Sequence, residues 1–394
     1  GSQEDLDSAS LDDVKDFFRR FYSPSNASLS IAGDFDSDQA RRLVELYFGE
    51  VPPGPPIDRV ARLESGLRGE TSITVRDKVQ LPRLYLVWPA CPMFDPQEAP
   101  LDLLAAVLGD GKSSRLHRSL VYEKQIAREV SVYSDSQEIA GEFRIQVTAS
   151  PGHTLEESQE VVEEELARIR REPPTEEEVS RAKNRIESQH VRQLERFGGF
   201  AGRADQLNHF NVFAKDPGVI NTDLDRYMTV SAEEVTRAAQ SFLSGDRVRM
   251  AVLPESAAKP STQSVDRSVM PKSSAPGQYG TPVAARHRFQ NGLSLLHVEK
   301  RGIPLVAVGM LLRSGAMKDP ADRPGLAHMT AAMLLEGTVT RSSQQIAEET
   351  EFLGAHLDST AAREHVSLSV ETLTANWRKA LGLMADVARN ATFP

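Results

Sequence analysis

Apolar side chains recur at helical spacing in two separate stretches of the chain, at 10–21 and 231–242. Each stretch is followed by a turn and then by a segment in which apolar and polar positions alternate, at 27–31 and 248–252. Such alternation is typical of a half-buried strand. Each helical stretch also begins with Ser followed three residues later by an acidic residue, a pattern that caps the first turn of a helix. Both regions therefore predict a capped helix, a tight turn and a strand.

These two regions are copies of one pattern. Matched positions keep a constant offset throughout, from Phe21 to Phe242 in the helix and from Leu29 to Met250 in the strand. A second repeat consists of a strand region that contains a proline and an apolar helix that a glycine closes. It occurs at 73–109 and again at 298–337, where Pro82 matches Pro304. The difference in residue number between the two copies is slightly larger in the helix than in the strand. A repeated sequence of elements predicts a repeated module.

The repeats divide the chain into parts. We expect residues 3–57 to be the carboxyl-terminal tail of a first module, and residues 66–255 to form a complete module. Residues 282–394 are expected to be the amino-terminal half of a further module. The stretch 256–281 is rich in Ser, Pro, Ala and Lys, and has the composition of a linker. This division implies that the chain is the middle of a longer parent.

Runs of strands and runs of helices alternate within the complete module. This order implies an α+β fold with repeated modules, each a mostly antiparallel sheet with helices packed on one face. Because equal patterns imply equal backbones, we also expect residues 10–50 to pack onto the complete module. The predicted elements are strands at 71–75 and 83–88, a helix at 97–108, strands at 127–133 and 141–149, and helices at 155–170 and 175–197.

Composition removes several classes of function. Of the 394 residues, 46 are Lys or Arg and 56 are Asp or Glu, which gives a net charge of −10 and no general attraction for nucleic acid or anionic lipid. Cys91 is the only cysteine, so the sequence allows no internal disulfide and no thiolate zinc cluster. No apolar run reaches the roughly 18 to 20 residues of a membrane span. The compartment stays open between bacterial periplasm and cytoplasm.

Short motifs stand in a recognisable order in four stretches, 10–35, 108–152, 230–253 and 289–354. They include Gly111-Lys112-Ser113-Ser114-Arg115-Leu116, Asn291-Gly292-Leu293, Pro324-Gly325-Leu326-Ala327-His328 and Leu335-Glu336-Gly337-Thr338. In these motifs the chain resembles the pitrilysin and insulinase superfamily of zinc metallopeptidases, the inverzincins, which includes mitochondrial processing peptidase. The resemblance implies repeated α+β modules whose two halves enclose a chamber for a peptide or unfolded polypeptide. It also implies zinc in the parent.

One half of such a peptidase carries the inverted zinc motif H-x-x-E-H on a helix. Its two His residues bind Zn²⁺, and its Glu acts as base on the metal-bound water. Here the matching segment has His328 at the first ligand position, but Ala331 replaces the Glu and Ala332 replaces the second His. One imidazole cannot hold a catalytic zinc ion, and a methyl group cannot accept a proton. We therefore expect no catalytic residue, no metal ligand and no cofactor in this chain.

The resemblance also implies an Arg and a Tyr that hold the substrate carbonyl. At the matching positions the chain has Val121 and Arg128, so this clamp is not carried over. Arg128 is either a contact for peptide backbone or a solvated arginine at a strand end.

Three further patterns have a structural and a functional interpretation. The segment 109–113 ends like a phosphate-binding loop, but a helix precedes it and its first glycine is missing, which favours a plain helix terminus. The glycines at 198–202 indicate a hinge or a helix end. His356 and His365, with Asp358 and Glu364 between them, could bind a metal or could face apart on a strand and its turn.

Two functions remain. In the first, the chain is a non-catalytic part of a pitrilysin-type zinc metallopeptidase and forms part of the peptide-binding chamber of a parent that hydrolyses peptides through an upstream H-x-x-E-H site. In the second, the chain belongs to a zinc-free binding or assembly subunit of a processing-peptidase-like complex. Expected partners are a peptide, the other modules of the parent and, in an oligomer, further copies. Whether the parent is an enzyme depends on that upstream motif.

Overall fold

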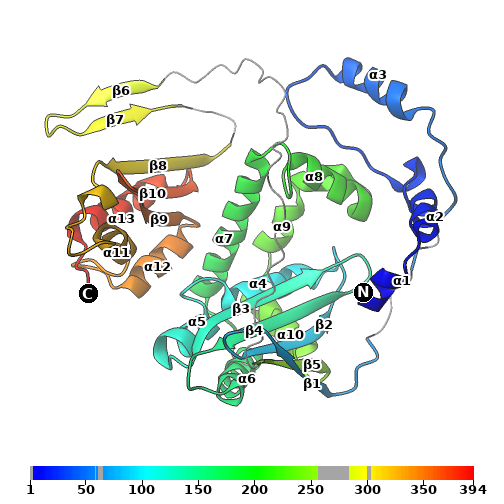
Figure 1. Ribbon diagram of the computed structural model, residues 1–394, viewed down its shortest axis with the longest axis horizontal. Coiled ribbons are helices and arrows are strands. Elements are labelled where there is room, and N and C mark those ends of the chain that lie inside the picture. The colour runs from blue at the N-terminus through cyan, green and yellow to red at the C-terminus, as the bar shows by residue number, and fades with distance from the viewer. Residues whose placement is uncertain (1–2, 58, 61–64, 256–283, 300–302) are drawn as a thin grey trace.

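The computed structural model describes residues 3–57, 59–60, 65–255, 284–299 and 303–394. Figure 1 shows two packed units, one around a five-stranded sheet and one around a three-stranded sheet, and an amino-terminal arm that runs along the outside of the first unit. The predicted linker at 256–281 lies outside the described residues. The α+β class expected from the sequence is confirmed.

The first unit contains the elements that the sequence predicts, within a few residues. Its sheet has the order β1-β5-β2-β4-β3, and every neighbouring pair is antiparallel except β1 with β5. The elements are β1 (Glu70–Asp77), β2 (Arg83–Ala90), α4 (Glu98–Gly109), α5 (Arg115–His117), β3 (Ala127–Ser136), β4 (Gly141–Ala149), α6 (Leu155–Arg171), α7 (Glu176–Glu195), α8 (Arg203–His209), α9 (Asp223–Met228), α10 (Ala232–Phe242) and β5 (Arg247–Pro254).

Alternation along β2 sets the core of this unit. Leu84, Leu86 and Trp88 are fully buried, and the residues between them are half-buried. The buried side chains pack beneath α4, which is apolar on nearly all sides, and beneath α6 and α10. Burying one such side chain stabilises the fold by about 1.5–3 kcal/mol. Thr154 and Thr175 form complete capping boxes that start α6 and α7.

The second unit repeats part of this topology. Its sheet order is β8-β10-β9, with both pairs antiparallel, as in the order β2-β4-β3 of the first unit. A separate hairpin of β6 and β7 precedes it. The elements are β6 (Ala285–Arg288), β7 (Ser294–His297), β8 (Leu305–Leu312), α11 (Leu326–Met333), α12 (Ser343–Phe352), β9 (His356–Ala361), β10 (Val366–Leu373) and α13 (Trp377–Asn390).

The amino-terminal arm corrects two expectations. Its helix α2 (Leu11–Phe21) forms where the pattern favours helix, and Ser10 caps it as predicted. The arm also contains α1 (Gln3–Ser8) and α3 (Ser37–Phe48). The predicted strand at 27–31 is absent, because no neighbouring strand among the described residues offers it hydrogen bonds. The expected packing of residues 10–50 on the first unit is also wrong, since neither α2 nor α3 buries any residue.

Candidate functional site

The three positions that match the zinc motif all lie on α11. Asp319 starts this helix by accepting hydrogen bonds from the backbone N–H groups of Gly325 (2.7 Å) and Ala327 (2.9 Å). His328 and Ala332, four residues apart, are both exposed. Ala331 is only 2% exposed, and α11 packs against β9. The helix and the first ligand position are thus present, while the other two positions carry methyl groups.

Replacing Ala331 with Glu is expected to destabilise the second unit. A carboxylate placed in this buried position loses its hydration without a described partner, at a cost of roughly several kcal/mol before its pKa rises to neutralise it. The same change at exposed Ala332 is expected to leave the melting temperature nearly unchanged. Thermal unfolding of the two variants at pH 7 measures the difference, and equal stability would contradict the placement of Ala331.

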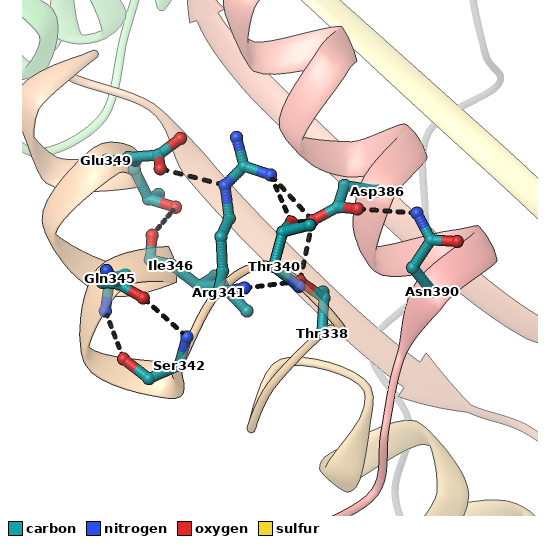
Figure 2. Close-up of polar contacts among 10 residues, drawn as sticks. Thr338, Thr340, Arg341, Ser342, Gln345, Ile346, Glu349, Asp386 and Asn390 are labelled. Atoms are coloured by element: carbon teal, nitrogen blue, oxygen red, sulfur yellow. Dashed lines mark hydrogen bonds and ion pairs between the residues drawn. The ribbon is translucent and has the colours of Figure 1, made fainter.

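A polar network fixes the loop after α11, as Figure 2 shows. Arg341 donates to Glu349 of α12 (2.9 Å) and to Asp386 of α13 (2.8 Å), and Thr338 donates its hydroxyl to the same Asp386 oxygen (2.8 Å). Asn390 donates to the other oxygen (2.7 Å). These hydrogen bonds, with the charge of Arg341, lower the pKa of Asp386 to about 2. The network ties the loop to two helices.

The two positions that match the substrate clamp both lie in the first unit. Val121 lies in a short π-helical stretch, Arg118–Glu123, and packs against the first core. Arg128 is exposed at the start of β3, at an irregularity in the pairing with β4. An apolar side chain turned to the core cannot hold a carbonyl.

The remaining predicted patterns take ordinary places in the fold. His356 pairs with Glu371 at one end of the β9–β10 hairpin, whereas His365 lies at its turn, so the two imidazoles are at opposite ends. Among the residues that the structure describes, no group of three or more His, Cys, Asp or Glu side chains could share a metal ion. The segment 109–113 begins at the last residue of α4, and the glycines at 198–202 lie between α7 and α8.

The sequence did not reveal a polar junction between the two units. Glu351, near the end of α12, accepts hydrogen bonds from the backbone N–H of Lys112 (2.9 Å) and from the hydroxyl of Ser113. Gly111 has a φ of +88°, which favours glycine, and a Cβ there would displace the Glu351 carboxylate from this contact. Burial raises the pKa of Glu351.

Helix α7 completes the junction. Asn184 donates to the carbonyl of Phe352 (2.7 Å), and Ser188 (2.5 Å) and Arg192 (2.9 Å) donate to the carbonyl of Gly354. These side chains satisfy carbonyl groups at the carboxyl end of α12, which a helix leaves without partners of its own. One face of α7 therefore caps a helix of the other unit.

A cavity of about 710 Å³ lies in the first unit between α4, β3, α7 and α9. Asp102 of α4 lies in its lining and accepts a hydrogen bond from the hydroxyl of Tyr227 (2.9 Å). Burial raises the pKa of Asp102 to about 7. His190 of α7 also lines the cavity, and burial lowers its pKa. The single acidic residue within the run 101–108 is the sequence signal that could have indicated this cavity.

Comparison with known proteins identifies the family. A family model described as the Peptidase M16 inactive domain matches residues 8–186, and one described as Insulinase (Peptidase family M16) matches residues 296–394. Together they cover well over half of the chain. The chain belongs to the M16 peptidase family. The resemblance to pitrilysin and insulinase peptidases is thereby confirmed, and M16 peptidases are zinc-dependent.

Curated M16 relatives match parts of the chain. An uncharacterized zinc protease of Rickettsia felis is 29% identical over 106 residues, which are 27% of this chain and 26% of that protein. The zinc protease PqqE of Helicobacter pylori is 24% identical over 209 residues, which are 51% of this chain and 46% of that protein. The chain thus spans between about a quarter and a half of the length of these two relatives.

Solved structures show the same fold. A protease from Helicobacter pylori superposes with a TM-score of 0.58 at 20% identity, covering 64% of this chain and 61% of that one. The periplasmic protease PqqL from Escherichia coli covers all of this chain with 48% of its own, with a TM-score of 0.53 at 15% identity. At these identities the likeness establishes the M16 fold. In the described part of the chain, no helix is long and apolar enough to cross a membrane.

Proposed function

We propose that this chain is a non-catalytic part of an M16 zinc metallopeptidase and contributes to the chamber that holds the peptide substrate. The observation that carries the proposal is the state of α11, which presents His328 on an exposed face but has Ala331 and Ala332 at the other two motif positions. Zinc and catalysis then belong to an H-x-x-E-H site in another module of the parent. The match of residues 8–186 to the inactive domain of the family supports this assignment.

The module division proposed for the parent agrees with where the repeats fall. Residues 3–57 are the closing part of a first module, residues 66–255 a complete non-catalytic module, residues 256–281 a linker, and residues 282–394 the opening part of a further module. The exposed apolar face of α2 supports the first assignment, because a lone helix gains little from such a face in water. The topology shared by β2-β4-β3 and β8-β10-β9 supports the last.

The purified chain is expected to bind no stoichiometric zinc and to cleave no peptide. One exposed imidazole supplies a single ligand, whereas catalytic zinc sites use three protein ligands. Metal analysis after dialysis against micromolar zinc, together with a fluorogenic peptide assay, measures both properties, and His328→Ala is expected to change neither. About one tightly held zinc ion per chain that is lost in His328→Ala would overturn the proposal.

A zinc-free binding or assembly subunit is the second candidate, favoured by the same loss of ligands on α11. The two candidates differ only in another module of the parent. Full-length parent protein is expected to hold zinc and to cleave unfolded peptides if the first candidate is correct. A parent that binds peptide but neither holds zinc nor cleaves would favour the second.

A further inference from the structure

The cavity of the first unit is rich in hydrogen-bond acceptors and has no basic side chain in its wall. Four carboxylates line it, those of Asp102, Asp110, Asp205 and Asp223, whereas no described Lys or Arg is part of the lining. The volume of about 710 Å³ is in the range of small-molecule sites. All lining residues lie between 102 and 227, inside the complete module. The walls of the cavity therefore come from no other part of the chain.

Three of these four carboxylates have an ordinary environment. Arg185 pairs with Asp110 (2.5 Å), and Arg226 pairs with Asp223 (2.7 Å). Both arginines lie outside the lining, so each pair offsets the charge of a carboxylate without filling the cavity. The third carboxylate is exposed and keeps its hydration. The fourth is that of Asp102.

Asp102 is buried without a cation beside it. It accepts a hydrogen bond from the neutral hydroxyl of Tyr227 (2.9 Å), and no described Lys or Arg forms an ion pair with it. The charge of Arg226 lowers the pKa of Asp102 less than burial raises it, and the resulting pKa is about 7. A buried carboxylate is costly when charged unless a cation pairs with it. Asp102 would therefore stabilise a cation that enters the cavity.

The rest of the lining fits a ligand with an N–H donor and an apolar chain. The side-chain oxygen of Gln206 is buried and has no hydrogen-bond donor among the described residues. An unpaired buried acceptor is costly, and an incoming donor would satisfy it. Val132 and Phe210 are buried and provide apolar walls. Phe200 also lines the cavity and is 92% exposed, so the cavity is open to solvent.

The state of Asp102 also favours one kind of cation. One of its oxygens already accepts from Tyr227. A guanidinium binds best through two parallel hydrogen bonds that use both carboxylate oxygens, whereas an ammonium is a compact charge with three rotatable donors. We propose that this cavity binds a primary alkylammonium group, with Asp102 as its counter-ion, the Gln206 oxygen as a second acceptor and the alkyl chain against the apolar walls. The group is either the lysine side chain of a peptide or a free alkylamine.

Isothermal titration calorimetry of the full 394-residue chain at pH 8 tests the proposal. Nα-acetyl-lysinamide represents the peptide source and n-butylamine the free amine, and at least one of them is expected to bind at one site per chain. Their neutral counterparts, Nα-acetyl-norleucinamide and n-butanol, are expected to bind roughly tenfold more weakly or less, and Asp102→Asn is expected to weaken ammonium binding by a similar factor. Asp225→Asn is the matched control, because Asp225 of α9 is exposed and outside the lining. It is expected to bind like the unsubstituted chain.

The pH dependence of binding tests whether Asp102 is the counter-ion. Affinity is expected to rise roughly tenfold from pH 6 to pH 8, because a carboxyl with a pKa of about 7 gains its charge there while an alkylammonium with a pKa of about 10.4 keeps its own. His190→Gln and His209→Gln remove the two imidazoles of the lining, and the rise is expected to persist in both and to vanish in Asp102→Asn. The other charged or titratable groups around the cavity are Glu98 and Asp110 of α4, Tyr133 of β3, Arg185 of α7, Asp205 of α8, and Asp223, Arg226 and Tyr227 of α9.

The two probes distinguish the two sources of the ammonium. Binding of Nα-acetyl-lysinamide alone would assign the group to a peptide, binding of n-butylamine alone would assign it to a free amine, and either result supports the site. The proposal would be overturned if neither probe binds at millimolar concentration, if the neutral counterparts bind equally well, or if Asp102→Asn changes neither the affinity nor its rise with pH. A rise that depends on either imidazole would overturn it as well. Neither zinc nor peptide cleavage enters these measurements, so the proposed function stands or fails separately.

Discussion

Asp102→Asn is expected to stabilise the chain at pH 8 by about 4 kcal/mol at most, and to have almost no effect at pH 4. In the folded chain, burial beside the cavity raises the pKa of Asp102 to about 7 from its ordinary value of 3.8. Between pH 4 and pH 7 the folded state therefore binds more protons here than the unfolded state does. Stability falls as pH rises through this window. Asn removes the titration and keeps an oxygen that can accept from Tyr227.

Asp386→Asn is the matched control, and the opposite sign is expected. The pKa of Asp386 is lowered to about 2 by Asn390, Thr338 and Arg341, so its carboxylate stabilises the fold above the ordinary pKa and loses this effect as pH falls toward 2. Urea unfolding of the Asp102 variant between pH 4 and pH 8, and of the Asp386 variant between about pH 2 and pH 5, measures the two slopes. A shift of the same sign in both variants, or no pH dependence for Asp102→Asn, would contradict the placement of Asp102 at a buried site.

Local patterns predicted the first unit well, because each signal acts over a few residues. The capping boxes at Thr154 and Thr175 and the alternation along 83–88 need no distant partner to be read. The repeat likewise predicted a strand before an apolar helix in the second unit, and β8 and α11 confirm it. The motifs of the sequence also identified the M16 family, which the family models confirm.

Features that depend on contacts between residues far apart in the sequence were predicted wrongly or not at all. The alternation at 27–31 is a valid strand pattern, but a strand needs a neighbour to receive its hydrogen bonds, and none of the described strands lies beside it. Asp102 and Tyr227 are far apart in the sequence, as are Ser113 and Glu351. No local pattern joins such pairs. Burial decides their pKa values and their roles, and burial exists only after the units have packed.

Glu351→Ala is expected to loosen the junction between the two units while each unit stays folded. The change removes the acceptor for the Ser113 hydroxyl and the Lys112 N–H. A buried donor left without a partner costs about 1–3 kcal/mol. The contacts of α7 with Phe352, Gly354 and Glu371 and the ion pair of Lys112 with Glu336 (3.5 Å) then carry the junction. Amide hydrogen exchange along 111–114 and at the carboxyl end of α12 is expected to become roughly ten- to a hundredfold faster, consistent with that energy.

Glu348→Ala serves as the control on the same helix, since Glu348 bonds with Gln344 within α12 (3.2 Å) and removing it leaves the junction donors paired. At 111–114 the Glu348 variant is expected to exchange its amide hydrogens at the same rate as the unsubstituted chain. If the Glu351 variant exchanges faster throughout β9 and β10 as well, the side chain stabilises the second unit itself. Unchanged exchange at 111–114 would mean that the remaining contacts between the units hold this segment without Glu351. Faster exchange confined to the two contacting segments assigns Glu351 to the junction, because only there does its carboxylate bridge one unit to the other.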